Sequence, residues 1–364
     1  MTSTDVAIIG AGPAGLFAAF QCGTLGLSTT VLDALETVGG QCAALYPEKP
    51  IYDIPAFERI DAAELVQRLE RQVAPFRPDY RLGERVDTLT RAAGGSGWRV
   101  STDRGTTFTA RTVVLAAGAG AFEPIRPDLP GLREFEETGA VSYVVRRREE
   151  FRGRRLVIAG GGDSAVDWAL SLSEVAQTVR VVHRRDRFRA APESEQKLRT
   201  LAAKGDGSLA LVTPYQLDSL VGRDGRLNGV RVRRMDGAAE MLELEADLLL
   251  PLFGLEASLG PMADWGLEIV DRRYVAVDPA TGQTALPGVF AVGDVAAYPG
   301  KQRLILTAFA EAAVAAHSAH ALARPGEILR FQHSTARGAP TAPTAAARSE
   351  GIRITRPMAE SSAR

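Results

Sequence analysis

The chain has 364 residues, a formal net charge of -1, and 45% hydrophobic and 24% charged residues. This length allows two domains with separate cores, and the near-zero charge argues against a nucleic-acid-binding protein, whose domains are usually strongly basic. The two cysteines form neither a disulfide framework nor a zinc pattern, so no metal site is expected. No stretch approaches the roughly 18 apolar residues of a membrane span, and we therefore expect a cytoplasmic protein without a membrane partner.

The N-terminal segment has the order strand, glycine turn, helix, strand. These elements are predicted at residues 6–9, 10–15, 16–26 and 29–32. The turn matches G-x-G-x-x-G, in which the first glycine permits a tight turn, the second lets the backbone approach a pyrophosphate, and the third lets the helix pack on the strand. An acid at the end of the second strand can accept hydrogen bonds from ribose hydroxyls and selects against a 2′-phosphate. The segment predicts a site for a non-phosphorylated dinucleotide at Gly10, Gly12, Pro13, Gly15 and Asp33.

A second segment repeats this order of elements. They are predicted at residues 154–159, 160–162, 164–176 and 178–183. Where the first segment ends in an acid, this one ends in His-Arg-Arg-Asp-Arg-Phe-Arg at 183–189, and guanidinium groups can hold a 2′-phosphate that a carboxylate would repel. The second segment is therefore predicted to bind NADPH. The contacting residues are predicted to be Gly161, Gly162, Asp163, Ser164, His183, Arg184, Arg185 and Arg189.

Beta structure is expected outside these two segments. Short strands are predicted at residues 81–89, 98–102, 106–110 and 112–116, and more within 208–256. A further strand over 288–294 ends in Gly-Asp before an alanine-rich helix at about 304–322. Asp294 would then lie on a ribityl chain, and the helix dipole would stabilise the negative charge of a reduced flavin ring. One chain with two dinucleotide sites indicates a permanent and an exchangeable cofactor, and these features favour FAD as the permanent one.

In this order, the pieces resemble the two-dinucleotide-binding-domain flavoproteins of the thioredoxin-reductase-like group. Further matches make the chain similar to the ferredoxin (or flavodoxin)–NADP reductases of the thioredoxin-reductase-like type. These matches lie at residues 39–41, 45–49, 51–54, 160–169, 183–190, 253–255, 265–267 and 333–335. The resemblance covers residues 4–335 and rests on the combination of motifs.

The resemblance implies an α/β fold of two Rossmann-like domains, with an NADPH-binding domain inserted in a split FAD-binding domain. The implied boundaries are 1–116 and 286–335 for FAD and 117–285 for NADPH, with linkers near 117–121 and 281–287 as hinges. Residues 336–364 contain no aromatic residue and are expected to form a mobile tail. A homodimer is implied by the family alone.

The resemblance also implies roles around the flavin. Asp33 would bind the adenosine ribose and Asp294 the ribityl and pyrophosphate side. Tyr46 would stack on one flavin face and His333 on the other, with Thr335 contacting the flavin. Further FAD contacts are implied for Gly40, Gln41, Val86 and Phe122. The alternatives are that Tyr46 and Phe122 are core aromatics and His333 a surface residue. Hydride would pass from NADPH to the flavin, so no side-chain acid or base is required.

The chain departs from its thiol-dependent relatives. Thioredoxin reductases carry C-x-x-C just before the second fingerprint, but residues 141–144 here read Val-Ser-Tyr-Val. Cys42 follows Gly-Gly-Gln as in the glutathione-reductase branch, but Pro47 occupies the position of the second cysteine, and Cys22 is predicted to be core. Electrons are therefore expected to leave the flavin singly for a transient protein partner, ferredoxin or flavodoxin.

Steering of such a partner would need a basic surface. The candidate basic run consists of Arg146, Arg147, Arg148, Arg152, Arg154 and Arg155, which alternatively form a solvated linker. Three other functions stay open: a reductase of a thiol protein that uses Cys42, a diaphorase or ferric reductase with a small-molecule acceptor, and a redox sensor that binds both nucleotides without turnover.

Overall fold

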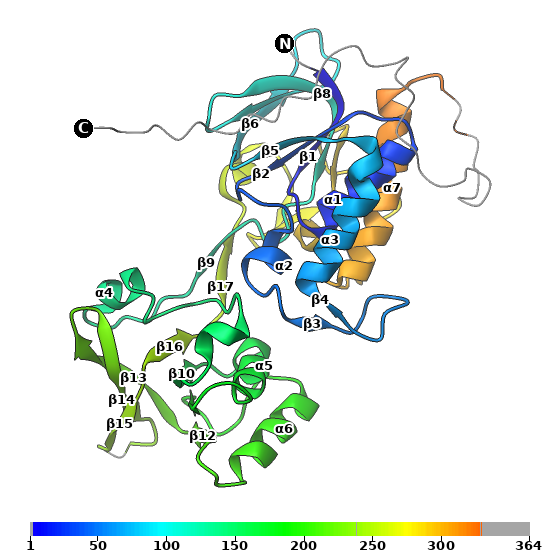
Figure 1. The fold of residues 1–364 in the computed structure, drawn as a ribbon. Coiled ribbons are helices and arrows are strands. Elements are labelled where there is room, and N and C mark those ends of the chain that lie inside the picture. The colour runs from blue at the N-terminus through cyan, green and yellow to red at the C-terminus, as the bar shows by residue number, and fades with distance from the viewer. Residues whose placement is uncertain (1–2, 238, 328, 330–364) are drawn as a thin grey trace, which may run out of the picture. The chain divides into compact units, whose positions relative to one another are not determined.

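The computed structural model describes residues 3–237, 239–327 and 329, which form two compact units. Unit 1 contains the chain up to Ala44, the segment Lys49–Ala121 and the chain from Ser258 onward. Unit 2 contains Leu45–Glu48 and Phe122–Ala257. The insertion of one unit within the other was predicted, and the α/β fold with two Rossmann-like units is confirmed (Figure 1).

Unit 1 is built on a seven-stranded sheet whose order is β5-β2-β1-β8-β7-β6, with β20 also paired to β8. The strands are β1 (Ser3–Ile9), β2 (Thr29–Asp33), β5 (Asp79–Leu82), β6 (Val86–Arg91), β7 (Trp98–Thr102), β8 (Thr107–Leu115) and β20 (Val289–Ala291). The first four strands of this order and β20 pair in parallel, whereas β6, β7 and β8 pair in antiparallel fashion. Residues 4–9 of β1 are all buried, as expected for a parallel strand covered on both faces.

Helix α1 (Pro13–Thr24) packs against α3 (Ala62–Val73) and α7 (Ile305–Ala323) on one face of this sheet (Figure 1). The residues that α7 buries are mainly alanines, whose small side chains allow close packing: Ala308, Ala312, Ala315, Ala316, Ala319 and Ala323. By length and composition alone, the 19-residue α7 is apolar enough to cross a membrane, so the expectation that no such stretch exists was wrong. A single helix of this kind is weak grounds for a span, because core helices of globular proteins meet the same criterion.

The second domain boundary lies earlier than predicted. Residues 259–277 form η3 (Gly260–Asp264), β18 (Ile269–Val270) and β19 (Tyr274–Ala276), and β19 pairs with β21 (Ala296–Ala297). Their apolar side chains share one buried cluster with the central strands of unit 1. That cluster includes Leu259, Met262, Leu267, Val275, Val289 and Ala291. The boundary therefore follows Ala257, and the predicted hinge at 281–287 is wrong because it lies inside unit 1.

Unit 2 contains a parallel sheet of order β12-β11-β10-β16 and an antiparallel sheet of order β13-β14-β15. Its elements include β10 (Arg155–Ala159), α5 (Asp163–Leu172), β11 (Thr178–Val182), α6 (Pro192–Ala202), β12 (Leu209–Val212), β13 (Tyr215–Arg223), β14 (Arg226–Arg234), β15 (Met241–Glu245) and β16 (Leu248–Pro251). The remaining short elements are spread over both units. In unit 1 they are α2 (Gly40–Ala44), β3 (Pro50–Ile51), β4 (Ile60–Asp61), η1 (Ala74–Phe76) and η4 (Gly293–Val295). In unit 2 or at its boundaries they are β9 (Ala121–Pro124), α4 (Leu132–Glu137), η2 (Arg148–Phe151) and β17 (Leu255–Ser258). Strands β9 and β17 contain the two crossings after Ala121 and Ala257, and they pair with each other.

The predicted strands differ from the structure at two places. The strand expected over 81–89 is two strands, because Gly83 has a left-handed φ of 71° and its N–H donates to Leu35 instead of continuing the ladder. Conversely, the strands expected over 106–110 and 112–116 are one, because the polar side chain of Arg111 points out of a continuous β8. Arg111 there donates to the Ala323 carbonyl at 2.8 Å.

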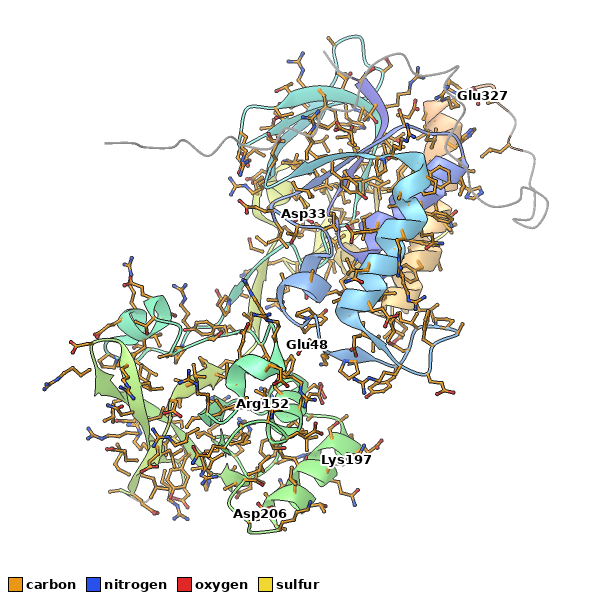
Figure 2. All side chains as sticks on the ribbon, in the orientation of Figure 1. Asp33, Glu48, Arg152, Lys197, Asp206 and Glu327 are labelled. Carbon is orange, nitrogen blue, oxygen red and sulfur yellow. The ribbon has the colours of Figure 1, made fainter. Side chains whose placement is uncertain are left out.

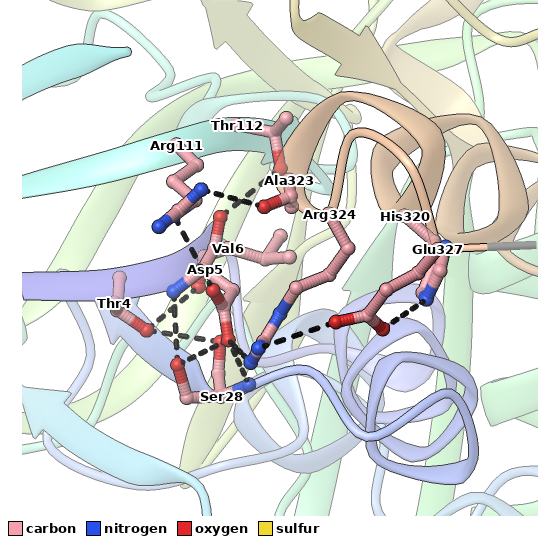
Figure 3. Close-up of polar contacts among 10 residues, drawn as sticks. All are labelled: Thr4, Asp5, Val6, Ser28, Arg111, Thr112, His320, Ala323, Arg324 and Glu327. Atoms are coloured by element: carbon pink, nitrogen blue, oxygen red, sulfur yellow. Dashed lines mark hydrogen bonds and ion pairs between the residues drawn. The ribbon is translucent and has the colours of Figure 1, made fainter. Parts of the chain in front are cut away.

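A polar cluster joins the end of α7 to the start of β1 (Figure 3). The buried carboxylate of Asp5 accepts hydrogen bonds from the Ser28 backbone at 2.9 Å, the Ser28 hydroxyl at 2.8 Å and the Arg324 guanidinium at 3.0 Å. Burial acts to raise the pKa of Asp5, but these hydrogen bonds outweigh it and hold that pKa below its usual value. The cluster therefore stabilises the fold only while Asp5 is ionised.

We predict that Asp5→Ala lowers the free energy of unfolding of unit 1 by about 1–3 kcal/mol at neutral pH. Because the native pKa is lowered, this contribution is complete above the unfolded value of about 3.9 and is lost as the pH falls through the native value. Differential scanning calorimetry of the variant and the unmutated protein should show a Tm difference at neutral pH that shrinks toward about pH 3.5. Asp79→Ala, at an exposed ion pair with Arg81, is the control with little effect. A Tm difference for Asp5→Ala that is independent of pH would contradict this account.

Candidate functional site: two glycine turns with unlike neighbours

The first glycine turn joins β1 to α1 and is closed by backbone contacts. A Cβ atom on Gly10 would lie 2.3 Å from the Ala116 carbonyl oxygen, and one on Gly15 would lie 1.8 Å from the Gly10 oxygen. Gly12 differs, because its Cβ would meet only the Gly40 Cα at 3.8 Å. Pro13 begins the helix, where its missing N–H costs no hydrogen bond. Two glycines are thus required by the fold itself, while Gly12 leaves its outer side open to a ligand.

Asp33 ends β2 and lies against this turn (Figure 2). One carboxylate oxygen accepts a hydrogen bond from the Ala11 N–H at 2.7 Å and the other from the Leu35 N–H at 2.9 Å. Burial raises the pKa of Asp33, and the two hydrogen bonds act against that rise. Each carboxylate oxygen has a further lone pair, so the carboxylate of Asp33 can also accept hydrogen bonds from ribose hydroxyls.

Helix α2 begins beside the same turn. The Gly39 N–H donates to the Ala11 carbonyl at 2.8 Å, and a Cβ on Gly40 would lie 3.0 Å from the Gly12 Cα. The predicted residue Gly40 is therefore next to the turn, and Gln41 follows it in α2 with its side-chain nitrogen 3.5 Å from where a Cβ on Gly118 would lie. Val86 is 5% exposed and belongs to the buried cluster beneath the sheet.

The segment that carries Asp294 also lies against the first turn, although it comes from a distant part of the chain. It lies in η4, directly after Gly293, whose Cβ would be 3.2 Å from the Ala14 side chain. Burial raises the pKa of the Asp294 carboxyl, while the nearby cations Lys301 and Arg303 act to lower it. Among the residues that the structure describes, no hydrogen bond or ion pair engages this carboxylate.

Of the aromatic residues that the resemblance implies around the flavin, the structure describes only the Tyr46 side chain. Tyr46 belongs to the short piece Leu45–Glu48 of unit 2 and packs against the core of that unit. In this piece Glu48 accepts a hydrogen bond from the Arg148 N–H at 2.8 Å (Figure 2). Phe122 lies in β9, but its side chain is outside the described part of the structure, as are His333, Thr335 and the predicted tail at 336–364. Their contacts with a flavin stay predictions.

The second glycine turn, in unit 2, repeats the geometry of the first. Gly162 precedes α5 with φ -98° and ψ -179°, close to φ -72° and ψ -177° at Gly12. A Cβ on Gly160 would lie 2.5 Å from the Leu252 oxygen, whereas one on Gly162 would have no protein atom within 4 Å. A Cβ on Gly161 would lie 2.3 Å from the His183 ring, so this glycine admits the imidazole. The predicted duplication is therefore confirmed down to the backbone.

The basic segment after β11 folds back onto the second turn. The Arg189 N–H donates to the Gly161 carbonyl at 2.6 Å, and the Ala191 N–H donates to the Asp163 carboxylate at 2.8 Å. Burial lowers the pKa of His183, and the neighbouring arginines lower it further. The side chains that stay exposed beside the turn are those of Asp163, Ser164, Arg184, Arg185 and Arg189. The residues predicted to contact NADPH are thus gathered in one place.

Sequence reasoning missed the residues that support this basic segment. The buried Phe188 stacks on His183 with ring centroids 5.3 Å apart. The Arg199 guanidinium of α6 lies over the Phe188 ring, 5.5 Å from its centroid. The same guanidinium donates a hydrogen bond to the Asp186 carbonyl. A phenylalanine within a run of arginines was the available signal, because such a ring is expected to be buried.

The basic run at 146–155 does not form the basic patch that was considered. Four of its arginines are ion-paired with carboxylates, including Arg152 (Figure 2). The pairs are Arg147 with Glu150 at 3.0 Å, Arg148 with Glu174 at 3.0 Å, Arg152 with Glu149 at 2.7 Å and Arg155 with Asp247 at 2.7 Å. Because these carboxylates offset the charge, the run gives little support to steering of an acidic partner.

Neither cysteine is arranged for dithiol chemistry. Cys22 is fully buried in α1, and burial raises its pKa to about 12, which suppresses the reactive thiolate. Cys42 is 3% exposed in α2. Neither forms a disulfide.

Comparison with known proteins matches the chain to one family over most of its length. The model of the pyridine nucleotide-disulphide oxidoreductase family matches residues 4–319. The ferredoxin–NADP reductase of Rhodospirillum rubrum is 57% identical over 342 residues, which cover 93% of this chain and 97% of that protein. That of Paramagnetospirillum magneticum is also 57% identical, over 93% of this chain and 98% of that protein.

Among solved structures, the thioredoxin reductase of Lactococcus lactis superimposes with a TM-score of 0.73 at 26% identity, covering 88% of this chain and 99% of that one. The same fold therefore occurs in an enzyme that is much less similar in sequence than the ferredoxin–NADP reductases. The chain belongs to the pyridine nucleotide-disulphide oxidoreductase family and, within it, to the group of the ferredoxin–NADP reductases.

Proposed function

We propose that this protein is a ferredoxin–NADP reductase that holds FAD in unit 1 and binds NADPH in unit 2. The observation that carries the proposal is the contrast between two glycine turns of the same backbone geometry. One is followed by a strand that ends in the carboxylate of Asp33, the other by a strand that ends in the basic segment 183–189. A carboxylate suits an unphosphorylated ribose, and arginines suit a 2′-phosphate.

The residues of unit 1 fit FAD. The open side of Gly12 leaves room for a pyrophosphate, and the first N–H groups of α1 point toward it. Asp33 would hold the adenosine ribose. The carboxylate of Asp294, which no protein donor engages in the described part of the structure, would accept hydrogen bonds from the hydroxyls of the ribityl chain. When bound, FAD supplies the redox chemistry: it accepts a hydride and can release electrons one at a time.

The residues of unit 2 orient the reductant. The N-terminus of α5 and the open side of Gly162 would receive the pyrophosphate of NADPH. Arg184, Arg185 and Arg189 would hold the 2′-phosphate, and the stack of His183 on Phe188 keeps the segment that carries them against the turn.

The proposed electron acceptor is a one-electron protein carrier. The chain has two cysteines, both buried, so no dithiol is available to pass electrons to a thiol protein. Relatives with 57% identity are named ferredoxin–NADP reductases. Flavodoxin as a second carrier and a homodimeric state are further parts of the proposal that follow from the resemblance. A cytoplasmic location is also part of the proposal.

Gly12→Ala and Gly162→Ala test the two assignments separately. Both positions have extended backbone that any residue adopts, and an added Cβ meets no close protein atom, so both variants should fold. Gly12→Ala should weaken FAD binding about tenfold or more while sparing the KM for NADPH, and Gly162→Ala should do the reverse, because a methyl group then occupies the space of a pyrophosphate. Flavin absorbance of the purified proteins and steady-state kinetics measure the two effects. Equal effects of both variants on FAD content would contradict the assignment.

Arg184→Ala combined with Arg185→Ala should narrow the preference for NADPH over NADH. Loss of charge-assisted hydrogen bonds to the 2′-phosphate should lower kcat/KM for NADPH by about tenfold or more and leave that for NADH nearly unchanged. Arg152→Ala combined with Arg231→Ala removes the same charge from exposed ion pairs of unit 2 and is the matched control. The unmutated protein using both nucleotides equally well would rule out the assignment.

The acceptor is tested by NADPH oxidation with purified ferredoxin, flavodoxin and thioredoxin under identical conditions. We expect rapid reduction of ferredoxin, negligible reduction of thioredoxin, and full activity after thiol alkylation, because both cysteines are buried and unpaired with each other. Reduction of thioredoxin that alkylation abolishes would support the thiol-protein reductase instead. Fast turnover with ferricyanide but none with either carrier would indicate a diaphorase, and flavin that NADPH reduces only very slowly would indicate a sensor.

A further inference from the structure

A carboxylate on α7 collects three hydrogen-bond donors in the interior of unit 1. One oxygen of Glu311 accepts the Gly293 N–H at 2.7 Å. The other accepts the Tyr298 hydroxyl at 2.5 Å and the Lys301 ammonium. The side chains of Lys301 and Glu311 are only 4% and 13% exposed, so this ion pair is largely shielded from water.

A second carboxylate lies near the ammonium of Lys301. Its ion-pair partner Glu311 also holds the N–H of Gly293, the residue directly before Asp294, so Lys301 and Asp294 lie in the same part of unit 1, where the ammonium acts to lower the pKa of Asp294. A buried cation without a partner is costly, so Lys301 must pair with whichever carboxylate it can reach. As long as Glu311 holds the ammonium, the Asp294 carboxylate is left to other donors.

Arg303, the other cation near Asp294, is also held elsewhere. Its guanidinium lies over the Tyr274 ring, 3.9 Å from the centroid. Both cations that favour the ionised form of Asp294 are therefore near it without a hydrogen bond to it. Burial and the Glu311 carboxylate act to raise the pKa of Asp294, and the two cations oppose that rise without engaging the carboxylate in a hydrogen bond.

We propose that Glu311 is a positioning residue for FAD, because by holding Lys301 it keeps the Asp294 carboxylate available to the hydroxyls of the ribityl chain. This inference rests on the proposed function. It assigns a role to an acidic residue on an otherwise alanine-rich helix, and the same carboxylate fixes the Gly293 backbone from which Asp294 projects.

Glu311→Gln tests this role, because an amide keeps the shape and can still accept the Gly293 N–H but cannot balance the ammonium. Lys301 should then pair with Asp294, and the Kd for FAD of the apoprotein should rise roughly tenfold or more. The double variant Glu311→Gln, Lys301→Met removes the competing cation and should return the Kd to within about twofold of the unmutated protein. Quenching of FAD fluorescence on titration with apoprotein measures each Kd, and calorimetry of the apoproteins reports folding.

The outcomes separate a positioning role from a structural one. If Glu311 merely stabilises the fold, the double variant should bind FAD no better than the single variant, and that result would overturn the inference. An unchanged Kd in Glu311→Gln would also overturn it. If the single variant does not fold, the double variant decides alone, since folded protein with near-normal FAD affinity supports the inference and folded protein with weak affinity opposes it. Unmutated apoprotein that fails to bind FAD would instead refute the proposed function.

Discussion

The close approach of strand, turn and helix at each glycine turn is the constraint on which the rest of the molecule depends. At Gly10 and Gly160 a single added carbon would collide with a carbonyl oxygen of the neighbouring strand connection. Because the turn is this tight, the helix starts directly above the strand, and its unpaired N–H groups face the space beside Gly12 or Gly162. The same backbone is used twice, so the geometry alone would not distinguish two cofactors.

What distinguishes the two sites is the end of the second strand in each unit. Asp33 is tied to the first turn through the Ala11 N–H, and the basic segment is tied to the second through Arg189 and Ala191. In both units, therefore, the segment proposed to select the ribose is held by hydrogen bonds to the glycine turn or the helix that follows it. In the proposed function, selectivity and phosphate binding are thus parts of one hydrogen-bonded unit. The absence of a cysteine pair then separates this chain from relatives that pass electrons to thiols.

Much of this could be predicted from the sequence, because both fingerprints are local and their chemistry depends on residues at short spacing. Interactions between distant segments could not. The affiliation of residues 258–285 with unit 1 depends on burial of Leu259, Met262 and Val275 beneath a sheet assembled from the other end of the chain. The neutralisation of the basic run depends on acids as distant as Asp247. Glu311 gave no signal at all, because a lone acid on a helix is usually solvated and only the fold brings Lys301 to it.

The central claim is that the second turn alone recognises a 2′-phosphate while the first retains FAD. Calorimetric titration of the FAD-loaded protein with adenosine 2′,5′-bisphosphate and with adenosine 5′-monophosphate tests it most directly. The account predicts that the bisphosphate binds to a single site with an affinity higher by about tenfold or more, and that the flavin stays bound throughout. Equal affinities for the two nucleotides, or release of flavin by the bisphosphate, would contradict it.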